Sequence, residues 1–510
     1  MSLKAETDKQ LIGTGLKRRT EEALANEFLR KAVSFTTDKL KTGKLQATDE
    51  FGSWEAWRER GREIRKHVVE NLDYYLTQFS DNVAKAGGNV YFCSTGEEAV
   101  QTFLDIAKKR DAKLVAKGKS MVSEEIRLNH RLEEQGIEAI ETDLGEYILQ
   151  LAQETPSHLI IPAIHKNKQQ IADLFSNEAG ETFAPDTKVL AGYARGRLRN
   201  YFLEADIGLT GCNFGVAESG AITLVSNEGN GRMVSTVPPC HVVIMGMERL
   251  VPTYDDLEVM LNLLARSATG QKLTTYTSMI TGPRREGELD GPEELHLIIL
   301  DNGRSAQLGD PVFQEVLHCI RCAACLNACP VYRHVGGHTY GSVYSGPIGA
   351  VLTPLLQQDM KEAGQLAYAS SLCGACYEAC PVKIPLHDML VQLRARKVKQ
   401  GFTPLAERIA FKTFQTAFGH VKLYKLAARS AYYALKPFAK RGYLKKAPGP
   451  AAGWTQSRHF PMLAERPFRD RWSELQRELK RQPAKAASAA NEADAHANQE
   501  QPPQGGRQHD

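Results

Sequence analysis

Seven cysteines in two short runs constrain this 510-residue chain more than any other feature. The first run, CIRCAACLNACP, follows the spacing C-x2-C-x2-C-x3-C with a proline directly after the last cysteine. The second run, CGACYEACP, ends in another Cys-Pro step. This pattern is typical of proteins with two iron-sulfur clusters, in which the last cysteine of one run ligates the other cluster. The cysteines are Cys319, Cys322, Cys325 and Cys329 in the first run, and Cys373, Cys376 and Cys380 in the second.

The exchange of the last cysteine predicts two ligand sets. The first set is Cys319, Cys322, Cys325 and Cys380, and the second is Cys329, Cys373 and Cys376. The second set lacks one ligand, because Ser370 stands where the pattern would place a cysteine. That site then holds a 4Fe-4S cluster with a non-cysteine ligand, such as the Ser370 oxygen or water, or a 3Fe-4S cluster. Oxygen is a weak ligand for this chemistry, so we expect the second cluster to be the more labile one.

Structural zinc and a chance group of buried thiols are the alternatives to iron-sulfur clusters. Zinc sites use four ligands, commonly as two pairs with a long gap, and neither alternative explains two Cys-Pro endings. The spacing C-x3-C-x2-C of a radical-generating cluster does not occur. Three further cysteines stand alone, and we expect them to be structural thiols. They are Cys93, Cys212 and Cys240.

The rest of the chain predicts a multidomain protein that combines an α/β part with an all-α part. Residues 1–85 are predicted as a helical arm without visible chemistry, with one apolar face running from Trp57 to Phe79. Residues 86–305 alternate apolar runs with amphipathic stretches, which predicts a mostly parallel sheet with flanking helices. Thr95 and Glu98 form a candidate capping box there. The candidate strands are GNVYFC, KLVAKG, IEAIETD, SHLIIPAI, GAITLVS, HVVIMGM and LHLIIL.

The C-terminal part of the chain contains three segments of different composition. Residues 306–395 carry the cysteine runs and are predicted as a helical ferredoxin domain with two clusters. Residues 396–480 are predicted as a basic helical region, and residues 391–450 hold 14 Lys or Arg against the single acid Glu407. The segment from Arg394 to Lys446 is therefore predicted to bind an acidic partner or an anionic membrane, unless it is only a solvated face. Residues 481–510 carry no large apolar side chain and are predicted to be disordered.

Charge and hydropathy indicate where the protein is located and argue against nucleic acid as a partner. The formal net charge of +4 gives no indication of nucleic acid. The longest apolar runs are shorter than the roughly 18 residues of a membrane span, and MSLKAETDKQ does not resemble a signal peptide. We therefore expect a cytoplasmic protein, with attachment to the inner face of the membrane as an option through the basic region.

Several polar stretches of the α/β part, taken with the cysteine runs, resemble the lactate utilisation protein B family over residues 20–470. The resemblance implies a lactate-utilisation domain, a domain with two 4Fe-4S clusters, and a basic C-terminal region. It also implies work beside lactate utilisation proteins A and C in oxidising L-lactate to pyruvate. The 43 residues between Cys329 and Cys373 are similar to helical ferredoxin domains of succinate dehydrogenase and glycolate oxidase subunits. The stretches are KGKSMVSEEI, ETDLGEYILQ, PSHLIIPAIHK, LTGCNFGVAESGAITLVSNEGNGR and MGMERLVPT.

The α/β part offers candidates for a polar ligand site but no identified catalytic residue. Glu228 and Arg232 flank a loop at a strand end, where α/β sheets place their sites, although they could also form a surface pair. Glycines nearby indicate turns or close approaches of the backbone; they are Gly215, Gly220, Gly229 and Gly231. The other candidates are Lys117, Lys119, Glu124, Glu125, His158 and His165, and each histidine could instead be a hydrogen-bonded structural residue.

Three functions agree with these features. The first is an electron-transfer subunit that relays electrons through two clusters in a lactate-oxidising system. The second is a self-contained 2-hydroxy-acid oxidoreductase whose α/β part binds the substrate, although no flavin or nicotinamide fingerprint is visible. The third is an electron-transfer adaptor docked on the membrane through its basic helices.

Overall fold

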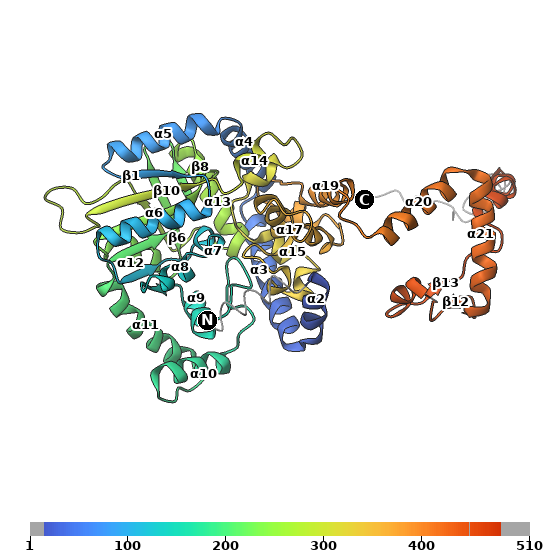
Figure 1. Ribbon diagram of the computed structural model, residues 1–510, viewed down its shortest axis with the longest axis horizontal. Helices are drawn as coiled ribbons and strands as arrows, with labels where there is room; N and C mark the ends of the chain where they lie inside the picture. Colours follow the sequence, from blue (N-terminus) through green and yellow to red (C-terminus); the bar gives the residue numbers. More distant parts are fainter. Residues whose placement is uncertain (1–14, 448, 481–510) are drawn as a thin grey trace, which may run out of the picture. The chain divides into compact units, whose positions relative to one another are not determined.

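The computed structural model describes residues 15–447 and 449–480. The chain divides between Phe402 and Thr403 into two compact units. The first unit holds a parallel sheet covered by helices and then a helical region with both cysteine runs (Figure 1). The predicted fold class, an α/β part followed by a helical ferredoxin-like part, is therefore confirmed.

The N-terminal arm is helical in the described residues, as predicted. Its apolar run from Trp57 to Phe79 does not form one continuous face, because the chain leaves the helical conformation at Asn71 and starts a new helix. The arm packs against helices of the α/β part and of the cysteine region. Its helices are α2 (Leu16–Ala25), α3 (Glu27–Asp49), α4 (Trp54–Glu70) and α5 (Leu72–Lys85).

The main sheet has six strands, and all of its neighbours are parallel. Every residue of its central strand β7 is buried, which explains why this strand reads as a continuous apolar run. Val242 and Ile244 pack toward α6, whereas Val243 and Met245 pack toward α5. In spatial order the strands are β1 (Asn89–Cys93), β10 (Glu294–Leu300), β7 (Cys240–Gly246), β4 (Ile207–Thr210), β2 (Leu114–Lys117) and β3 (Glu138–Glu141).

Helices connect these strands and cover both faces of the sheet. Thr95 caps the first of them, since its Oγ1 accepts the Glu98 N-H at 3.2 Å. The Glu98 carboxylate turns to the Ser94 N-H at 2.7 Å instead of that of Thr95, so only half of the predicted capping box forms. The helices are α6 (Gly96–Lys109), α7 (Met121–Glu125), α8 (Leu128–Glu134), α9 (Leu144–Ala152), α10 (Lys168–Ala179), α11 (Thr187–Glu204), α12 (Asn230–Thr236) and α13 (Tyr254–Thr269).

Two of the candidate strands were wrongly assigned to the parallel sheet. GAITLVS forms a strand, but it lies in a separate four-stranded sheet, where both of its neighbours are antiparallel. SHLIIPAI forms no strand. There the His158 Nδ1 accepts the N-H groups of Ile160 and Ile161, both at 3.1 Å, which bends the backbone into turns. The second sheet contains β8 (Leu250–Val251), β5 (Phe214–Val216), β6 (Ala221–Ser226) and β9 (Tyr276–Ile280).

The cysteine region is built from short helices around a single apolar core that it shares with α3 and α13. Within the described residues 305–402 there is no strand. Its elements are α14 (Ser305–Leu308), η1 (Gln314–His318), α15 (Ala324–Ala328), α16 (Tyr332–Val335), η2 (His338–Tyr340), α17 (Gly346–Leu356), η3 (Ala363–Tyr368), α18 (Ala375–Ala379) and α19 (Leu386–Lys399).

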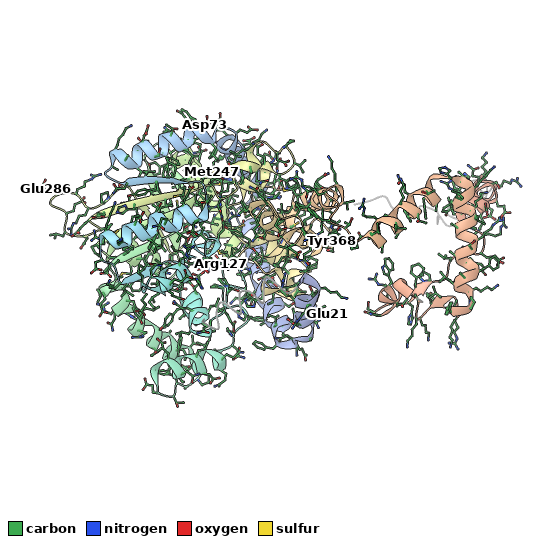
Figure 2. All side chains as sticks on the ribbon, viewed as in Figure 1. Glu21, Asp73, Arg127, Met247, Glu286 and Tyr368 are labelled. Atoms are coloured by element: carbon green, nitrogen blue, oxygen red, sulfur yellow. The ribbon has the colours of Figure 1, made fainter. Side chains whose placement is uncertain are left out.

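The second unit contains the predicted basic helices. No residue of its two longest helices is buried, and their side chains stand out along both helices (Figure 2). No helix in the described part of the chain is long and apolar enough to cross a membrane. The disordered tail predicted for 481–510 lies outside the described residues. The elements are α20 (Leu405–Gly419), α21 (Val421–Leu435), η4 (Lys436–Phe438), β11 (Ala439–Lys440), β12 (Tyr443–Leu444), η5 (Gly449–Thr455) and β13 (Phe460–Pro461).

Candidate metal centre

The seven cysteines line two small cavities. One is lined by Cys319, Cys322, Cys325 and Cys380, and the other by Cys329, Cys373 and Cys376, together with Ser370. Each cavity thus draws cysteines from both runs. The cavities measure about 20 and 10 Å³, so the match to a metal group comes from the sulfur donors gathered there and not from the free volume.

Local backbone geometry separates the last cysteine of each run from the others. Ala323 and Gly374 take positive φ values of 60° and 80°, and a one-turn helix starts after each. Both helices end in an extended residue, Cys329 at ψ 117° and Cys380 at ψ 121°. The following proline lacks an N-H and cannot continue the helix, which keeps the last cysteine apart from the turn that carries the others.

Most of the seven thiols are buried, and donor groups of the backbone point at them. Burial raises the pKa of Cys322 and of Cys376 to about 12, and raises that of Cys325 well above its ordinary value. Metal ligation requires thiolates, which burial disfavours. The positive charge of bound iron would stabilise these thiolates and lower the thiol pKa values again. Backbone amides already point at the sulfurs, since the N-H of Ile384 donates to the Cys380 Sγ at 3.4 Å. The donor set therefore fits iron-sulfur clusters.

Buried basic side chains reach the cysteine runs from distant parts of the chain. From the N-terminal arm, the Lys44 Nζ donates to the carbonyl of Ala379, and the Arg58 guanidinium donates to the carbonyl of Cys380 at 2.9 Å. Arg65 donates to the carbonyl of Leu317 at 3.0 Å, and Arg249 to that of Cys319 at 2.9 Å. A cluster with four thiolates is an anion, so these cations would stabilise it. The sequence did not predict these contacts of the arm, because its basic residues form no motif.

An ion-pair chain continues from the first cysteine set into the α/β part. The Arg321 guanidinium lies 3.4 Å from Glu248, which also pairs with Arg304 at 2.8 Å. Arg304 in turn binds Glu125 at 2.9 Å. Of the predicted polar candidates, Glu125 therefore belongs to this chain of ion pairs, whereas its neighbour Glu124 pairs with Lys117.

The larger of two polar cavities, about 290 Å³, lies at the carboxyl ends of β2, β4 and β6. This is where open α/β sheets bind ligands. It is lined by Lys119 and Arg249, and also by Leu159 and Arg321, which line the first cysteine cavity as well. The two cavities are therefore neighbours that share wall residues.

Glu228 lies in the wall of this larger cavity, as its position at a strand end predicted. Its carboxylate accepts the Leu144 N-H at 3.2 Å. Burial raises its pKa, and the nearby Asp143 raises it further. Within the described ranges, Glu228 and Arg232 form no ion pair, so the surface pair considered from the sequence does not form.

The four glycines of this region behave differently. A Cβ on Gly215 would lie 2.7 Å from the Phe79 ring, and one on Gly220 would lie 2.6 Å from the Val83 nitrogen. These two glycines therefore allow close approach to α5, as predicted. Gly229 needs only its positive φ of 79°, and Gly231 has no close neighbour.

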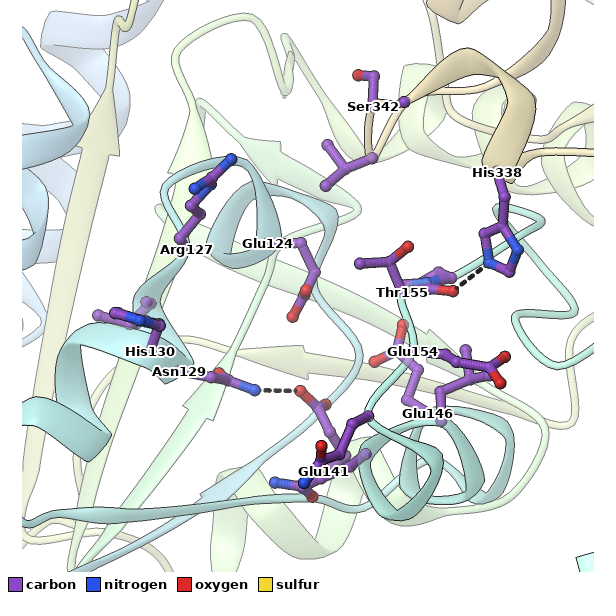
Figure 3. Close-up of a pocket in the computed structure, with 17 residues that line it drawn as sticks. Glu124, Arg127, Asn129, His130, Glu141, Glu146, Glu154, Thr155, His338 and Ser342 are labelled. Carbon is purple, nitrogen blue, oxygen red and sulfur yellow. Dashed lines mark hydrogen bonds between the residues drawn. The ribbon is translucent and has the colours of Figure 1, made fainter. Parts of the chain in front are cut away.

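A second polar cavity of about 150 Å³ is lined by carboxylates, including those of Glu124, Glu141 and Glu146 (Figure 3). Lys117 is fully buried beside it and pairs with Glu124 and Glu141. Both carboxylate oxygens of Glu146 are buried without a hydrogen-bond partner in the described residues. Burial raises the pKa of Glu146 well above its ordinary value, and Glu141 adds to the effect.

The two candidate histidines are held by hydrogen bonds. The His158 Nε2 lies 3.0 Å from the Asn327 Oδ1, which connects the α/β part to the cysteine region. Burial lowers the pKa of His158 to about 4, so the ring is neutral at pH 7. The His165 Nε2 lies 2.6 Å from Glu154, and its ring is 4.6 Å from that of His338. Asn327 and His338 are distant in sequence, and Glu154 lies across the turns that contain Pro156 and Pro162, so the sequence did not predict these neighbours.

The three remaining cysteines have distinct surroundings. The Cys93 sulfur lies 3.6 Å from the Thr102 hydroxyl, and Cys212 lines the larger cavity. The ligand atoms of Cys240, Glu294 and His296 all lie within 4.8 Å of one another. Their structural role stays a prediction.

One further residue that sequence reasoning missed is His387, which lines the second cysteine cavity. Its only sequence signal is that it follows the second cysteine run closely.

Family models match three consecutive parts of the chain. A LUD domain model matches residues 76–300, and a 4Fe-4S dicluster domain model matches residues 315–384. A model described as Lactate utilisation protein B, C-terminal, matches residues 393–477. The second match assigns iron-sulfur clusters to the region that contains both cysteine cavities.

Whole-chain relatives agree with these matches. The chain is 53% identical to Lactate utilization protein B of Bacillus licheniformis over 484 residues, which covers 94% of this chain and 99% of that protein. It is 55% identical to Lactate utilization protein B of Lysinibacillus sphaericus, over 89% of this chain and 95% of that one. The protein of that name from Bacillus subtilis is 53% identical over 90% and 96% of the two chains. Among solved structures, a DUF162 family protein from Deinococcus radiodurans covers 45% of this chain and 98% of its own, with 14% identity and a TM-score of 0.26.

Proposed function

Because the chain belongs to the lactate utilisation protein B family, we propose that it is the iron-sulfur electron-transfer subunit of a bacterial system that oxidises L-lactate to pyruvate. Its expected partners are lactate utilisation proteins A and C. The names of the relatives support a role in lactate utilisation, and the dicluster match supports the electron-transfer role.

The observation that carries the proposal is the pair of neighbouring cavities lined by cysteines of both runs. We assign Cys319, Cys322, Cys325 and Cys380 to one 4Fe-4S cluster, and Cys329, Cys373 and Cys376 to a second. When bound, such clusters accept and release single electrons. Cys325 lies in α15 and Cys329 follows that one-turn helix directly, although the two line different cavities, which supports a short separation between the two sites.

The protein environment gives the two sites different access to the surface. Cys322, Cys325 and Cys380 are buried, whereas Cys373 of the second set is exposed. The first site is thus enclosed next to the α/β part, and the second lies where a partner protein could approach it. This difference supports electron transfer from the enclosed first cluster site to the second site near the surface.

Spectroscopy of the assembled system tests the proposal. The chain is purified anaerobically with its clusters and mixed with lactate utilisation proteins A and C. We expect L-lactate to bleach the visible absorbance of the clusters and to generate the electron paramagnetic resonance signal of reduced clusters. The matched control is a Cys322→Ala, Cys376→Ala double variant in the same mixture. Clusters that stay oxidised in the wild-type mixture while lactate is consumed would refute the electron-transfer role.

A second candidate function, a self-contained 2-hydroxy-acid oxidoreductase, is favoured by the cavity of about 290 Å³ beside the first cysteine set. Its basic residues Lys119 and Arg249 suit a carboxylate, and guanidinium groups bind carboxylates with two hydrogen bonds. Glu228, with its raised pKa, is placed to accept a proton. A bound organic acid would then lie next to the first cluster site, since Leu159 and Arg321 line both cavities.

Lactate oxidation by the purified chain decides between the two functions. If the chain with its clusters reduces an artificial acceptor with lactate in the absence of partners, the second function holds. In that case Lys119→Gln should raise the KM for lactate, while Lys113→Gln, an exposed lysine away from the cavity, should not. Reduction that requires proteins A and C supports the first function.

A further inference from the structure

We propose that the Nδ1 of His387 is the fourth ligand of the second cluster. The inference rests on the two-cluster assignment proposed above, which leaves one iron of that cluster without a cysteine. The second cavity is lined by Cys329, Cys373 and Cys376, and also by His387. No ligand role for a histidine is visible in the spacing of the cysteines.

The position of His387 is fixed by the fold. It lies in the first turn of α19, just after Pro385 and seven residues beyond Cys380. Its ring packs against that of Tyr377, with the ring centres 5.5 Å apart. Tyr377 belongs to the one-turn helix α18 that also carries Cys376. The histidine and the cysteine are therefore held on adjoining elements.

The two ring nitrogens of His387 have unequal surroundings. Nδ1 is buried and has no hydrogen-bond partner in the described part of the chain. A buried nitrogen without a partner is costly, and a metal ion would satisfy it. Nε2 lies 3.7 Å from the carboxylate of Asp388. Metal-ligating histidines commonly direct the other ring nitrogen at a carboxylate, which keeps the proton on that side.

His387 is a better ligand than Ser370, which stands at the missing cysteine position. The Ser370 Oγ already accepts the Leu372 N-H at 3.1 Å. To ligate strongly, the hydroxyl would have to lose its proton, and oxygen is a hard donor for iron in a sulfur cluster. A neutral imidazole donates the Nδ1 lone pair to iron while its proton stays on Nε2. Imidazole suits iron, and histidine replaces cysteine in Rieske clusters.

Pulsed electron paramagnetic resonance of the reduced full-length chain tests this ligand directly. We expect a strongly coupled nitrogen on the second cluster, whose coupling changes when the protein is grown with 15N-labelled histidine. In His387→Ala the coupling should disappear and the second cluster should convert to a three-iron form or be lost, while the first cluster stays. His387→Cys should keep a four-iron cluster without the coupling and with a lower potential, since histidine ligation raises it.

Two matched variants separate the ligand from its neighbours. Ser370→Ala should keep the nitrogen coupling, and so should His334→Ala, which removes an exposed histidine of the same region. A coupling that survives in His387→Ala overturns the proposal. Loss of the fourth iron in Ser370→Ala but not in His387→Ala overturns it as well. Iron analysis that finds a single cluster in the wild-type chain would instead refute the two-cluster assignment, and the proposed ligand with it.

Discussion

Lys44 shows how one residue far from the cysteines in sequence can affect their chemistry. Its ammonium group is buried, donates to the carbonyl of Ala379, and lies 5.8 Å from the centre of the Trp54 ring. The carbonyl that it binds belongs to the residue directly before Cys380, so the ammonium group lies close to the first cysteine set. A buried positive charge at this point favours the reduced, more negative state of the first cluster.

Replacing Lys44 by Met should therefore lower the reduction potential of the first cluster. At an effective dielectric constant of about 20, a unit charge contributes about 1.7 kcal/mol at a separation of roughly 10 Å, which corresponds to about 70 mV for one electron and sets the order of magnitude of the expected shift. A redox titration followed by electron paramagnetic resonance measures the shift. Lys41→Met, an exposed lysine of the same helix, is the control and should leave the potential unchanged. An unchanged potential in Lys44→Met would show that water already screens this charge.

Cys380 tests the exchange of ligands between the runs. It belongs to the second run in sequence, but it lines the cavity of Cys319, Cys322 and Cys325. Cys380→Ala should therefore damage the first cluster preferentially and leave the signal of the second. Electron paramagnetic resonance of the anaerobically purified variant measures this, with Cys93→Ala as a control that should retain both clusters. A Cys380→Ala protein that keeps the first cluster and loses the second would contradict the assignment.

At the scale of elements, the sequence was informative where one local rule decides the structure. The strands GNVYFC, KLVAKG, IEAIETD, HVVIMGM and LHLIIL all lie in the parallel sheet, and each has the short apolar centre that a strand covered on both faces needs. SHLIIPAI has the same composition and forms turns, because the side chain of His158 binds backbone amides that a strand would need. Composition cannot reveal such a competing hydrogen bond.

The candidate site divides in the same way. The cysteine spacing is a local pattern, so the grouping of the seven cysteines around two cavities could be predicted, while their role as ligands stays a prediction. Arg58 and Arg249 reach those cysteines only through tertiary packing, and nothing in their own sequence neighbourhood marks them. His387 follows the second run closely, but the cysteine pattern assigns it no role. For the cavity of about 290 Å³ beside the first cysteine set, the sequence predicted only that a site would lie at strand ends near Glu228.

Gly208 of strand β4 offers a test of packing at this scale. A Cβ built there would lie 1.9 Å from the Val234 carbonyl oxygen, so α12 could not keep its place against the sheet. Gly208→Ala should lower the free energy of unfolding by about 1–3 kcal/mol, the usual cost of overpacking. Gly196→Ala, in the exposed face of helix α11 with nothing near its Cβ, should instead be neutral or stabilising by about 0.5–1 kcal/mol. Thermal unfolding of both variants makes the comparison, and equal melting temperatures would contradict it.

At the scale of the whole molecule, the predicted basic region separates into two kinds of residue. Arg394, Arg396 and Lys397 lie in α19 and hold the first unit together, since Arg396 pairs with Asp310 at 2.6 Å and Lys397 donates to the carbonyl of Lys361 at 2.8 Å. Residues 403–446 of the second unit contain ten Lys or Arg and the single acid Glu407. Two of these ten, Lys425 and Arg429, pair with Asp470 at 2.7 and 3.3 Å. The charge available for binding a partner therefore comes mainly from the other basic residues of the second unit.

The helices α20 and α21 expose large apolar side chains as well as this charge. Phe411, Phe414, Phe418 and Leu426 are each more than half exposed. A basic helix with exposed aromatic residues is typical of segments that lie in the interface of an anionic membrane, where apolar burial and charge attraction act together. We therefore expect these helices to bind anionic lipid.

Sedimentation with vesicles tests this expectation on the full-length chain. Binding to vesicles that contain phosphatidylserine should be strong at low salt and should weaken as salt rises, because the screening length falls from about 10 Å at 0.1 M to about 3 Å at 1 M. Lys422→Glu combined with Lys425→Glu should weaken binding at every salt concentration, and Phe414→Ser should weaken it even at high salt, where the apolar contribution dominates. Lys113→Glu, an exposed lysine of the first unit, is the control. Equal binding to neutral and anionic vesicles, or no binding to either combined with salt-sensitive binding to proteins A and C, would show that the surface these helices recognise is not anionic lipid.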